Sequence, residues 1–290
     1  MTARAPSCRS CDFEDLQLVL SLGRMPLANA LLSSDQLEQN EPAYPLDLAF
    51  FPPMHARVDY RDGPPGTSLP GVSLFFLVLR HHAFPCRSFE RADRRFPGVG
   101  RPESRGGDRQ QRRLSAPIYQ QRGIPVLGIE PAQNVARVAR EERGIKTLCE
   151  FFDAALAKDL RDQGVRPDII HAHNVLAHVA DLNGFVEGLG MLLPGHGVAV
   201  IEVPYLKDLI DHCEFDTIYH EHLCYFSLTA LDHLFRRHGP VIGDVERVPI
   251  HGGSLRLWAG QAAQARPGER VCALLAEEVA WGVDREDFYR

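Results

Sequence analysis

The feature that most constrains the fold is a regular alternation of short apolar runs and amphipathic segments in the second half of the chain. The apolar runs have the length of strands and the segments between them the length of helices. Such an alternation predicts an α/β fold with a parallel, doubly wound sheet. We expect strands at 125–130, 147–151, 168–171, 197–203 and 254–258, and helices at 132–143, 153–163, 182–193, 228–237 and 265–290.

Composition places the chain among soluble globular proteins. Of its 290 residues, 44% are hydrophobic and 24% charged, which is enough apolar material for one or two cores. The longest apolar run, 72–79, is far shorter than the roughly 20 residues of a bilayer helix, so we expect no membrane partner. No secretory signal is visible at the start, which favours a cytoplasmic location. The seven cysteines are therefore expected to be reduced thiols or metal ligands.

One segment, 51–117, differs from the rest of the chain. It holds 12 of the 32 basic residues, all of them Arg, but only 6 of the 38 acidic ones, together with 9 Pro and 7 Gly. Beyond its short apolar run no helix or strand period persists, which predicts a basic, disordered loop. Nucleic-acid binding is disfavoured because aromatic interleaving and a nucleic-acid-binding fold are both missing. We therefore expect no nucleic-acid partner.

The amino-terminal part begins with a pair of closely spaced cysteines. Cys8 and Cys11 are separated by two residues, a spacing typical of a zinc-binding module. The resulting organisation is an amino-terminal module at 1–50, the anomalous segment at 51–117, an α/β core at 118–262 and the start of a further region at 263–290.

The densest group of polar side chains lies between 214 and 222. Tyr219, Glu221 and His222 can supply a phenol, a carboxylate and a base for acid–base chemistry. A zinc site at His220 and His222 is disfavoured because residues two apart share no face of a strand or a helix, and a structural surface turn remains the other interpretation. His178 follows the expected strand at 168–171, where it would face the same crevice or serve as a satisfied structural residue.

Two further groups suit a bound ligand. Glu130 ends an expected strand, where an acid commonly binds ribose hydroxyls, although acids often follow short strands and the expected glycine loop is not found upstream. His251, Ser254 and Arg256 surround two glycines. This second group could bind an anionic moiety, and a tight turn explains it equally well.

Four stretches together resemble the S-adenosylmethionine-dependent C-methyltransferases that build branched deoxysugars on nucleoside diphosphates. The amino-terminal 50 residues also resemble the zinc module of that family, including Cys8-x-x-Cys11 and Pro26-Leu-Ala-Asn29. The resemblance covers about three quarters of the chain. The four stretches are Gly123–Val135, Asn174–Val179 with Asp181–Asn183, Phe215–His222 and His251–Arg256.

The resemblance implies a Rossmann-like class I methyltransferase sheet. It implies proton abstraction beside the keto group of a nucleotide-linked 4-keto-deoxysugar, followed by methyl transfer to carbon, with S-adenosylmethionine as cofactor and zinc as a structural metal. The roles that it implies are catalysis for His222, Glu221, Tyr219 and His178, cofactor binding for Glu130, Pro131 and Asn174, substrate binding for His251, Ser254 and Arg256, and zinc binding for Cys8 and Cys11.

The resemblance fails only between 51 and 117. There the family has a second Cys-x-x-Cys, a Tyr-x-Tyr-x-Ser-Ser segment and a cofactor loop, and we hypothesise that this stretch is a frame-shifted translation. Codons for Asp108–Pro117 exist that, entered one base later, give Ile-Ala-Ser-Asn-Asp-Gly-Tyr-Leu-Leu. The same offset forces a cysteine from Met54-His55 and allows Tyr-Leu-Tyr from Val72–Phe76.

Several expectations follow from the hypothesis. We expect the first strand and the cofactor loop to be missing, zinc to bind weakly or not at all, and the chain to stop before a further family domain. S-adenosylmethionine should therefore bind poorly, and activity should be impaired. A nucleotide-dependent oxidoreductase and a non-catalytic binding remnant are the rival interpretations, the former disfavoured because no suitable Gly-x-Gly-x-x-Gly is present.

Overall fold

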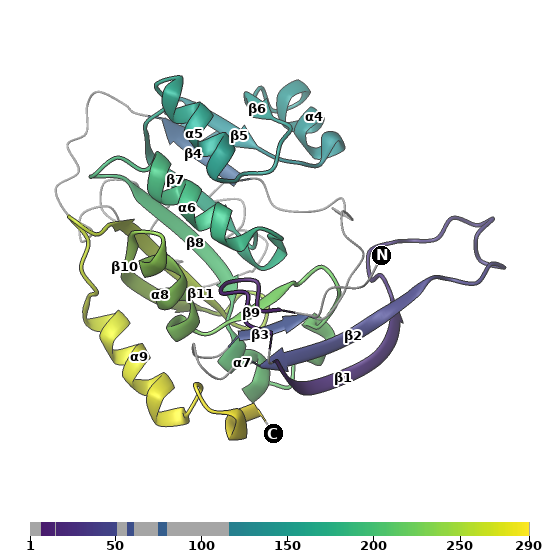
Figure 1. Ribbon diagram of the computed structural model, residues 1–290. Helices are drawn as coiled ribbons and strands as arrows, with labels where there is room; N and C mark the ends of the chain where they lie inside the picture. The colour runs from purple at the N-terminus through teal and green to yellow at the C-terminus, as the bar shows by residue number, and fades with distance from the viewer. Residues whose placement is uncertain (1–6, 15, 51–56, 61–74, 80–115, 290) are drawn as a thin grey trace.

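The computed structural model describes residues 7–14, 16–50, 57–60, 75–79 and 116–289, with backbone only for 57–60, 75–79 and 116–118. Its strands form two sheets, one of seven strands and one of four. In Figure 1 the larger sheet runs through the body of the molecule, and the smaller one lies below it and extends outward as an arm. No helix in the described part of the chain is both long and apolar enough to span a bilayer.

The seven-stranded sheet has the order β10-β11-β8-β7-β4-β5-β6. Strands β7 and β8 pair in parallel, as do β5 and β6, whereas β11 pairs antiparallel with β8 and with β10. The predicted α/β fold is therefore confirmed, but the sheet is mixed rather than parallel, because β4 also pairs antiparallel with β5 and β7. The strands are β4 (Phe75–Leu79), β5 (Val126–Ile129), β6 (Thr147–Leu148), β7 (Pro167–His173), β8 (Val198–Pro204), β10 (Pro240–Val248) and β11 (Ser254–Gln261).

Helices cover both faces of this sheet. The main hydrophobic core lies between one face and α5, α6, α8 and α9, and a smaller cluster on the other face includes Tyr119 of α3. Alternate residues of β7 serve the two faces, with Ile170 in the main core and Ile169 in the smaller cluster. The helices are α3 (Ala116–Gln121), α4 (Gln133–Glu141), α5 (Ala154–Asp162), α6 (Leu182–Leu192), α7 (Leu206–Asp211), α8 (Leu228–Arg237) and α9 (Glu269–Trp281).

Side-chain caps fix where three of these helices begin. Asp153, Asp181 and Ser227 accept hydrogen bonds from the backbone N–H groups three residues ahead, at 2.8, 2.9 and 3.1 Å. Such caps satisfy N–H groups that the first turn of a helix leaves without partners. The boundaries of α5, α6 and α8 are therefore encoded locally in the sequence.

The centre of the large sheet corrects one expectation. We expected the first strand to be missing, but β4, which comes from the Arg-rich segment, fills the position between β5 and β7. It pairs antiparallel with both neighbours. Its carboxyl-terminal Leu79 pairs with Pro167 at the start of β7, so this end of β4 lies at the sheet edge opposite the carboxyl ends of the parallel strands.

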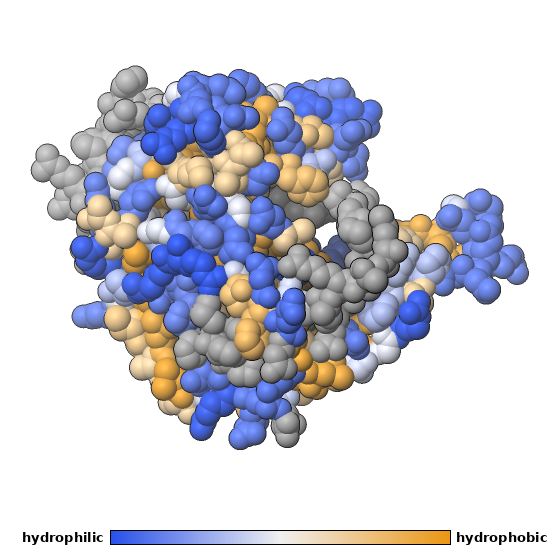
Figure 2. Space-filling view, viewed as in Figure 1, coloured by the Kyte–Doolittle hydropathy of each residue, from blue (hydrophilic) through white to orange (hydrophobic). Residues whose placement is uncertain are grey.

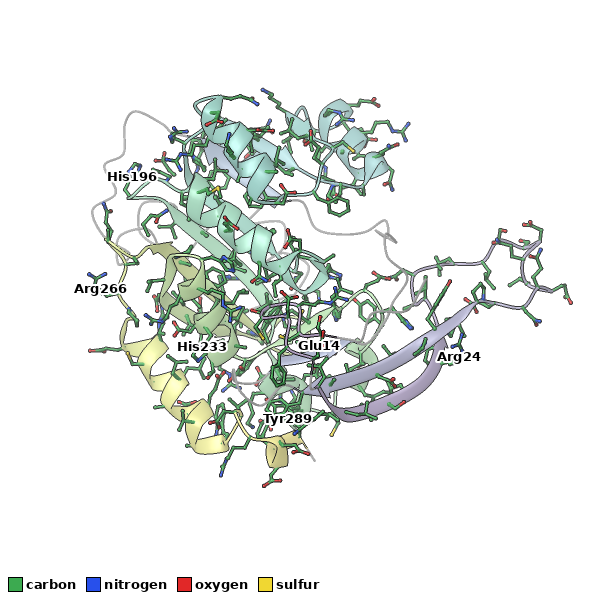
Figure 3. All side chains as sticks on the ribbon, in the orientation of Figure 1. Glu14, Arg24, His196, His233, Arg266 and Tyr289 are labelled. Atoms are coloured by element: carbon green, nitrogen blue, oxygen red, sulfur yellow. The ribbon has the colours of Figure 1, made fainter. Side chains whose placement is uncertain are left out.

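The amino-terminal module forms the second sheet. Strands β1 (Gln17–Pro26) and β2 (Ala43–Phe50) pair antiparallel, β3 (Arg57–Tyr60) joins β2, and β9 (Cys224–Phe226) of the core joins β3. Figure 2 shows that the tip of the β1–β2 arm is hydrophilic. Figure 3 labels Arg24, which lies on this arm. The core thus contributes the fourth strand of the module's sheet.

Two parts of the sequence prediction need revision. The anomalous segment 51–117 was expected to be disordered throughout, but it contains β3, β4 and the start of α3, while its remainder lies outside the described residues. The helix expected at 265–290 is α9, which ends where Gly282 adopts a left-handed conformation with φ 76°. Glycine tolerates this conformation and commonly ends helices.

Candidate active site

The candidate site lies beyond the carboxyl end of β7. There the chain turns through Asn174 into a short 3₁₀ helix, Leu176–His178, whose Ala177 carbonyl accepts a hydrogen bond from the Leu223 N–H at 2.8 Å. This bond ties the end of the strand to the segment carrying Tyr219 and His222. The imidazole rings of His178 and His222 lie 4.8 Å apart between centroids, as the shared crevice predicts.

His222 is oriented by hydrogen bonds at both ring nitrogens. Its Nδ1 lies 2.8 Å from the Thr217 carbonyl oxygen, and its Nε2 lies 3.0 Å from the Tyr219 hydroxyl. Because a carbonyl can only accept, Nδ1 carries the proton and Nε2 presents a lone pair that accepts the Tyr219 O–H. The pair therefore consists of an imidazole base and a phenol donor that share one hydrogen bond.

Burial keeps this pair uncharged. It lowers the pKa of His222 to about 4, with further contributions from the nearby His178 and His251. Burial also lowers the pKa of His178 and, together with the charge of Glu221, raises the pKa of the Tyr219 phenol. Near neutral pH, His222 is thus unprotonated and Tyr219 protonated, so the pair offers one proton acceptor and one hydrogen-bond donor.

Glu221 and Tyr225 complete the surroundings of His222. The backbone carbonyl of Glu221 partly opposes the lowering of the His178 pKa by burial, and the Glu221 carboxylate accepts a hydrogen bond from Asn29 Nδ2 of the amino-terminal module at 2.5 Å. Tyr225 contacts the His222 ring edge-on and donates from its hydroxyl to the Thr217 carbonyl at 3.3 Å. The four predicted catalytic residues therefore form one group.

The predicted cofactor-binding residues occupy the same edge of the sheet. Glu130 directly follows β5, is almost fully buried, and accepts a hydrogen bond from the Ala132 N–H at 2.8 Å across Pro131. Asn174 directly follows β7 with φ 52°, and its buried Oδ1 has no hydrogen-bond partner among the described residues. Buried acceptors at the carboxyl ends of these strands fit the hydroxyl and ammonium groups of S-adenosylmethionine. The prediction that the cofactor loop is missing concerns residues outside the described ones.

His251 lies in the turn before β11, close enough to His222 to lower its pKa. Both following residues must be glycine, because Gly252 and Gly253 have φ of +80° and +146°. A Cβ at these positions would also lie 1.8 Å from Glu214 Oε2 and 2.3 Å from Asp208 Oδ2. The two glycines of this motif are therefore explained by the tight turn that they form.

The other two predicted substrate-binding residues lie inside the sheet. Ser254 is fully buried and donates to the Ile250 carbonyl at 2.9 Å. Arg256 is only 4% exposed, and its Nε and Nη2 donate to Glu202 Oε2 at 3.1 and 2.9 Å. Because Glu202 already compensates the guanidinium charge, this arrangement does not support direct anion binding by Arg256.

Arg256 and Glu202 belong to a row of polar side chains across neighbouring strands. His173 of β7 and Arg256 of β11 flank Glu202 of β8, and Tyr119 reaches the same row by a 2.7 Å contact with His171. Burial alone raises the pKa of Glu202, but His173 and Arg256 outweigh it and bring that pKa down to about 2. Glu202 is therefore a buried anion held by its neighbours.

The cysteines of the amino-terminal module do not complete a metal site in the described part of the chain. Cys8 is buried against Leu16 and Ala49, with Cys11 beside this cluster. No three His, Cys, Asp or Glu side chains among the described residues are grouped to hold a metal ion. The described residues by themselves therefore do not supply the closed four-ligand site of a structural zinc.

Comparisons with known proteins agree with this arrangement. Residues 8–52 match the family model described as "Putative zinc binding domain", and residues 110–241 match the one described as "Methyltransferase domain". The chain is 36% identical over 176 residues to C-methyltransferase NovU of Streptomyces niveus, covering 60% of this chain and 41% of NovU. The chain is therefore similar to a methyltransferase domain preceded by a domain of the zinc-binding type.

A second relative and a solved structure are more distant. Ubiquinone biosynthesis O-methyltransferase of Bartonella quintana (strain Toulouse) is 32% identical over 79 residues, which cover 27% of this chain and 32% of that protein. The chain thus spans less than half the length of either curated relative. The crystal structure of magnesium protoporphyrin IX methyltransferase from Synechocystis PCC 6803 with bound SAH aligns with 52% of this chain and 69% of its own at 15% identity and a TM-score of 0.40.

Proposed function

We propose that this methyltransferase domain is built for S-adenosylmethionine-dependent methylation of a carbon beside the keto group of a nucleotide-linked 4-keto-deoxysugar. The observation that carries the proposal is the hydrogen-bonded pair of a neutral His222 and a protonated Tyr219, beside His178. The similarity to a C-methyltransferase supports transfer to carbon, and carbon becomes a nucleophile only after it loses a proton.

The residues account for the first step. His222 Nε2 takes the proton from the carbon beside the carbonyl, and the electron pair of that C–H bond moves onto the carbonyl oxygen. Tyr219 turns its O–H from Nε2 to that oxygen and, with His178, stabilises the enolate as a hydrogen-bond donor. Glu130, Pro131 and Asn174 would hold S-adenosylmethionine, which when bound supplies an electrophilic methyl group.

Proton abstraction is tested without the cofactor. Proton NMR in D₂O should show that the chain accelerates exchange of the hydrogen beside the keto group of a nucleoside diphosphate 4-keto-6-deoxyhexose. His222→Gln should abolish the acceleration, whereas His233→Gln, at an exposed histidine of α8 marked in Figure 3, should retain it. If the protein is folded and the hydrogen beside the keto group exchanges no faster than in buffer alone, the proposal is contradicted. Running the free sugar in parallel tests the nucleotide link.

We further propose that methyl transfer is impaired in this chain. The support is the direction of β4, whose carboxyl end leaves the sheet at the edge opposite Glu130. In such sheets the ligand binds at the carboxyl ends of the parallel strands, so a loop that directly follows β4 starts on the wrong side. Resequencing the coding DNA tests the frame-shift hypothesis: an uninterrupted frame, with no single-base change that restores the family motifs, contradicts it.

A further inference from the structure

A residue of the amino-terminal module contacts the catalytic group directly. Asn29, which lies three residues beyond β1, donates from Nδ2 to the Glu221 Oε1 at 2.5 Å. Glu221 is the neighbour of His222 in the chain, and its backbone carbonyl partly opposes the lowering of the His178 pKa by burial. The contact therefore joins the module to the segment that holds the proposed base.

Three other contacts fix the same segment to the module. Strand β9, which directly follows the Tyr219–Leu223 segment, extends the module's sheet by pairing with β3. Leu46 and Leu48 of β2 form a small hydrophobic cluster with Ile218 and Tyr225. His220 Nε2 donates to the Tyr44 carbonyl at 3.3 Å. The module and the catalytic segment thus share one sheet and one core, as the adjacent β2, β3 and β9 in Figure 1 illustrate.

The position of Glu221 matters for two members of the catalytic group. Its backbone carbonyl partly opposes the lowering of the His178 pKa, and after burial its carboxylate charge is the next contribution to the raised pKa of Tyr219. A displaced Glu221 would change the electrostatics around both the His178 imidazole and the Tyr219 phenol. Active-site geometry has to be held by supporting hydrogen bonds of this kind.

We propose, resting on the proposed function, that Asn29 is a positioning residue for proton abstraction and acts by holding the Glu221 carboxylate. The hydrogen bond is solvent-exposed, and such bonds add little to folding stability. Loss of Asn29 should therefore lower the rate of proton abstraction while the fold and substrate affinity remain.

A double-mutant cycle tests this proposal. Asn29→Ala should lower the kcat of hydrogen exchange by about tenfold with KM within about twofold. In the Glu221→Gln background, the same substitution should cause less than about a twofold further loss, because the two residues act through one contact. Asn29→Gln, which keeps the amide donor, should restore part of the rate. Asn40→Ala, at another exposed asparagine of the β1–β2 loop, is the matched control.

Two results would overturn the proposal. The first is an Asn29→Ala exchange rate within about twofold of that of the unmodified chain, and the second is that Asn29→Ala lowers the rate by the same factor with and without Glu221→Gln. If the unmodified chain shows no exchange activity, the proposed function fails and amide hydrogen exchange decides on Asn29. Asn29→Ala should then speed amide exchange in the Tyr219–Leu223 segment by about fivefold over Asn40→Ala. Unchanged amide exchange would overturn the proposal in that case.

Discussion

At the scale of single residues, the proposed base is a histidine that stays uncharged because it is buried. The pKa of His222 falls from 6.5 to about 4, mainly through burial. The folded chain therefore resists a proton that the unfolded chain takes up, and stability decreases as the pH falls from 6.5 toward 4. At neutral pH this cost is absent, and the lone pair of Nε2 is free to act as a base.

This shift predicts the pH dependence of proton abstraction. The exchange rate should hold nearly level as the pH falls through 6.5 and should drop only near pH 4 to 5, because protonation of His222 removes the base. Exchange rates measured across this range by NMR check the prediction, with circular dichroism confirming that the chain is folded at each pH. A half-maximal rate at the ordinary histidine pKa would contradict it.

The buried Arg256–Glu202 pair makes a second prediction at this scale. Arg256→Met leaves the Glu202 carboxylate buried with one partner fewer, which should lower the free energy of unfolding by about 3–5 kcal/mol. Replacing both residues, by Arg256→Met with Glu202→Leu, should cost clearly less, because no buried charge is then left behind. Urea unfolding measures both. Equal losses in the two variants would show that the charge of Glu202 is not the cause.

Single residues also show where sequence reasoning succeeds and fails. The group of His178, Tyr219, Glu221 and His222 could be predicted because reactive side chains recur in a short stretch and at the end of a strand. The burial of Arg256 could not, because motif spacing does not reveal that Glu202 lies beside it on the next strand. Asn29 was missed as a site residue because its contact with Glu221 depends on how two distant segments pack.

At the scale of elements, a buried carboxylate joins two helices. Glu278 of α9 accepts hydrogen bonds from the Leu228 and Thr229 N–H groups, both at 2.7 Å, and from the Tyr205 hydroxyl at 2.9 Å. These N–H groups belong to the first turn of α8, where a carboxylate is favoured by the helix dipole. Glu278 thus acts as a cap supplied by a neighbouring helix.

Glu278→Ala should therefore destabilise the chain. The change removes several buried hydrogen bonds and leaves the Leu228 and Thr229 N–H groups without their acceptor, at a cost of about 1–3 kcal/mol or more. Glu277→Ala, at the exposed neighbour on the same helix, is the control and should change stability by less than about 0.5 kcal/mol. Thermal unfolding of the two variants compares them, and equal melting temperatures would contradict the capping role.

The elements predicted best are those with strong local signals. The strands and helices expected between 125 and 203, and the helix at 228–237, are found in the structure because their apolar periodicity is local. The exception is the strand expected at 147–151, of which only the two residues of β6 are strand. Strands β9 and β10 and helix α7 were not predicted. Three-residue β9 is defined by pairing with β3 rather than by its own sequence, and no local pattern could give the direction of β4.

At the scale of the whole molecule, the proposed catalytic half of the site is assembled, whereas the half that would hold the cofactor has an altered central strand. The side that we propose forms the carbanion is assembled from the core and the amino-terminal module together, through the shared sheet and the contact of Asn29 with Glu221. The side that would hold the cofactor keeps Glu130 and Asn174 but has an antiparallel strand at its centre. We infer that proton abstraction and methyl transfer are separable in this chain.

Calorimetric titration of the chain with S-adenosylmethionine tests this claim most directly. Without a loop that follows a parallel central strand, the cofactor loses the backbone contacts that such loops provide. We predict binding no tighter than a Kd of about 1 mM, or no measurable heat of binding. Saturable binding with a Kd of about 1 µM would contradict the account, because it would require an intact cofactor site.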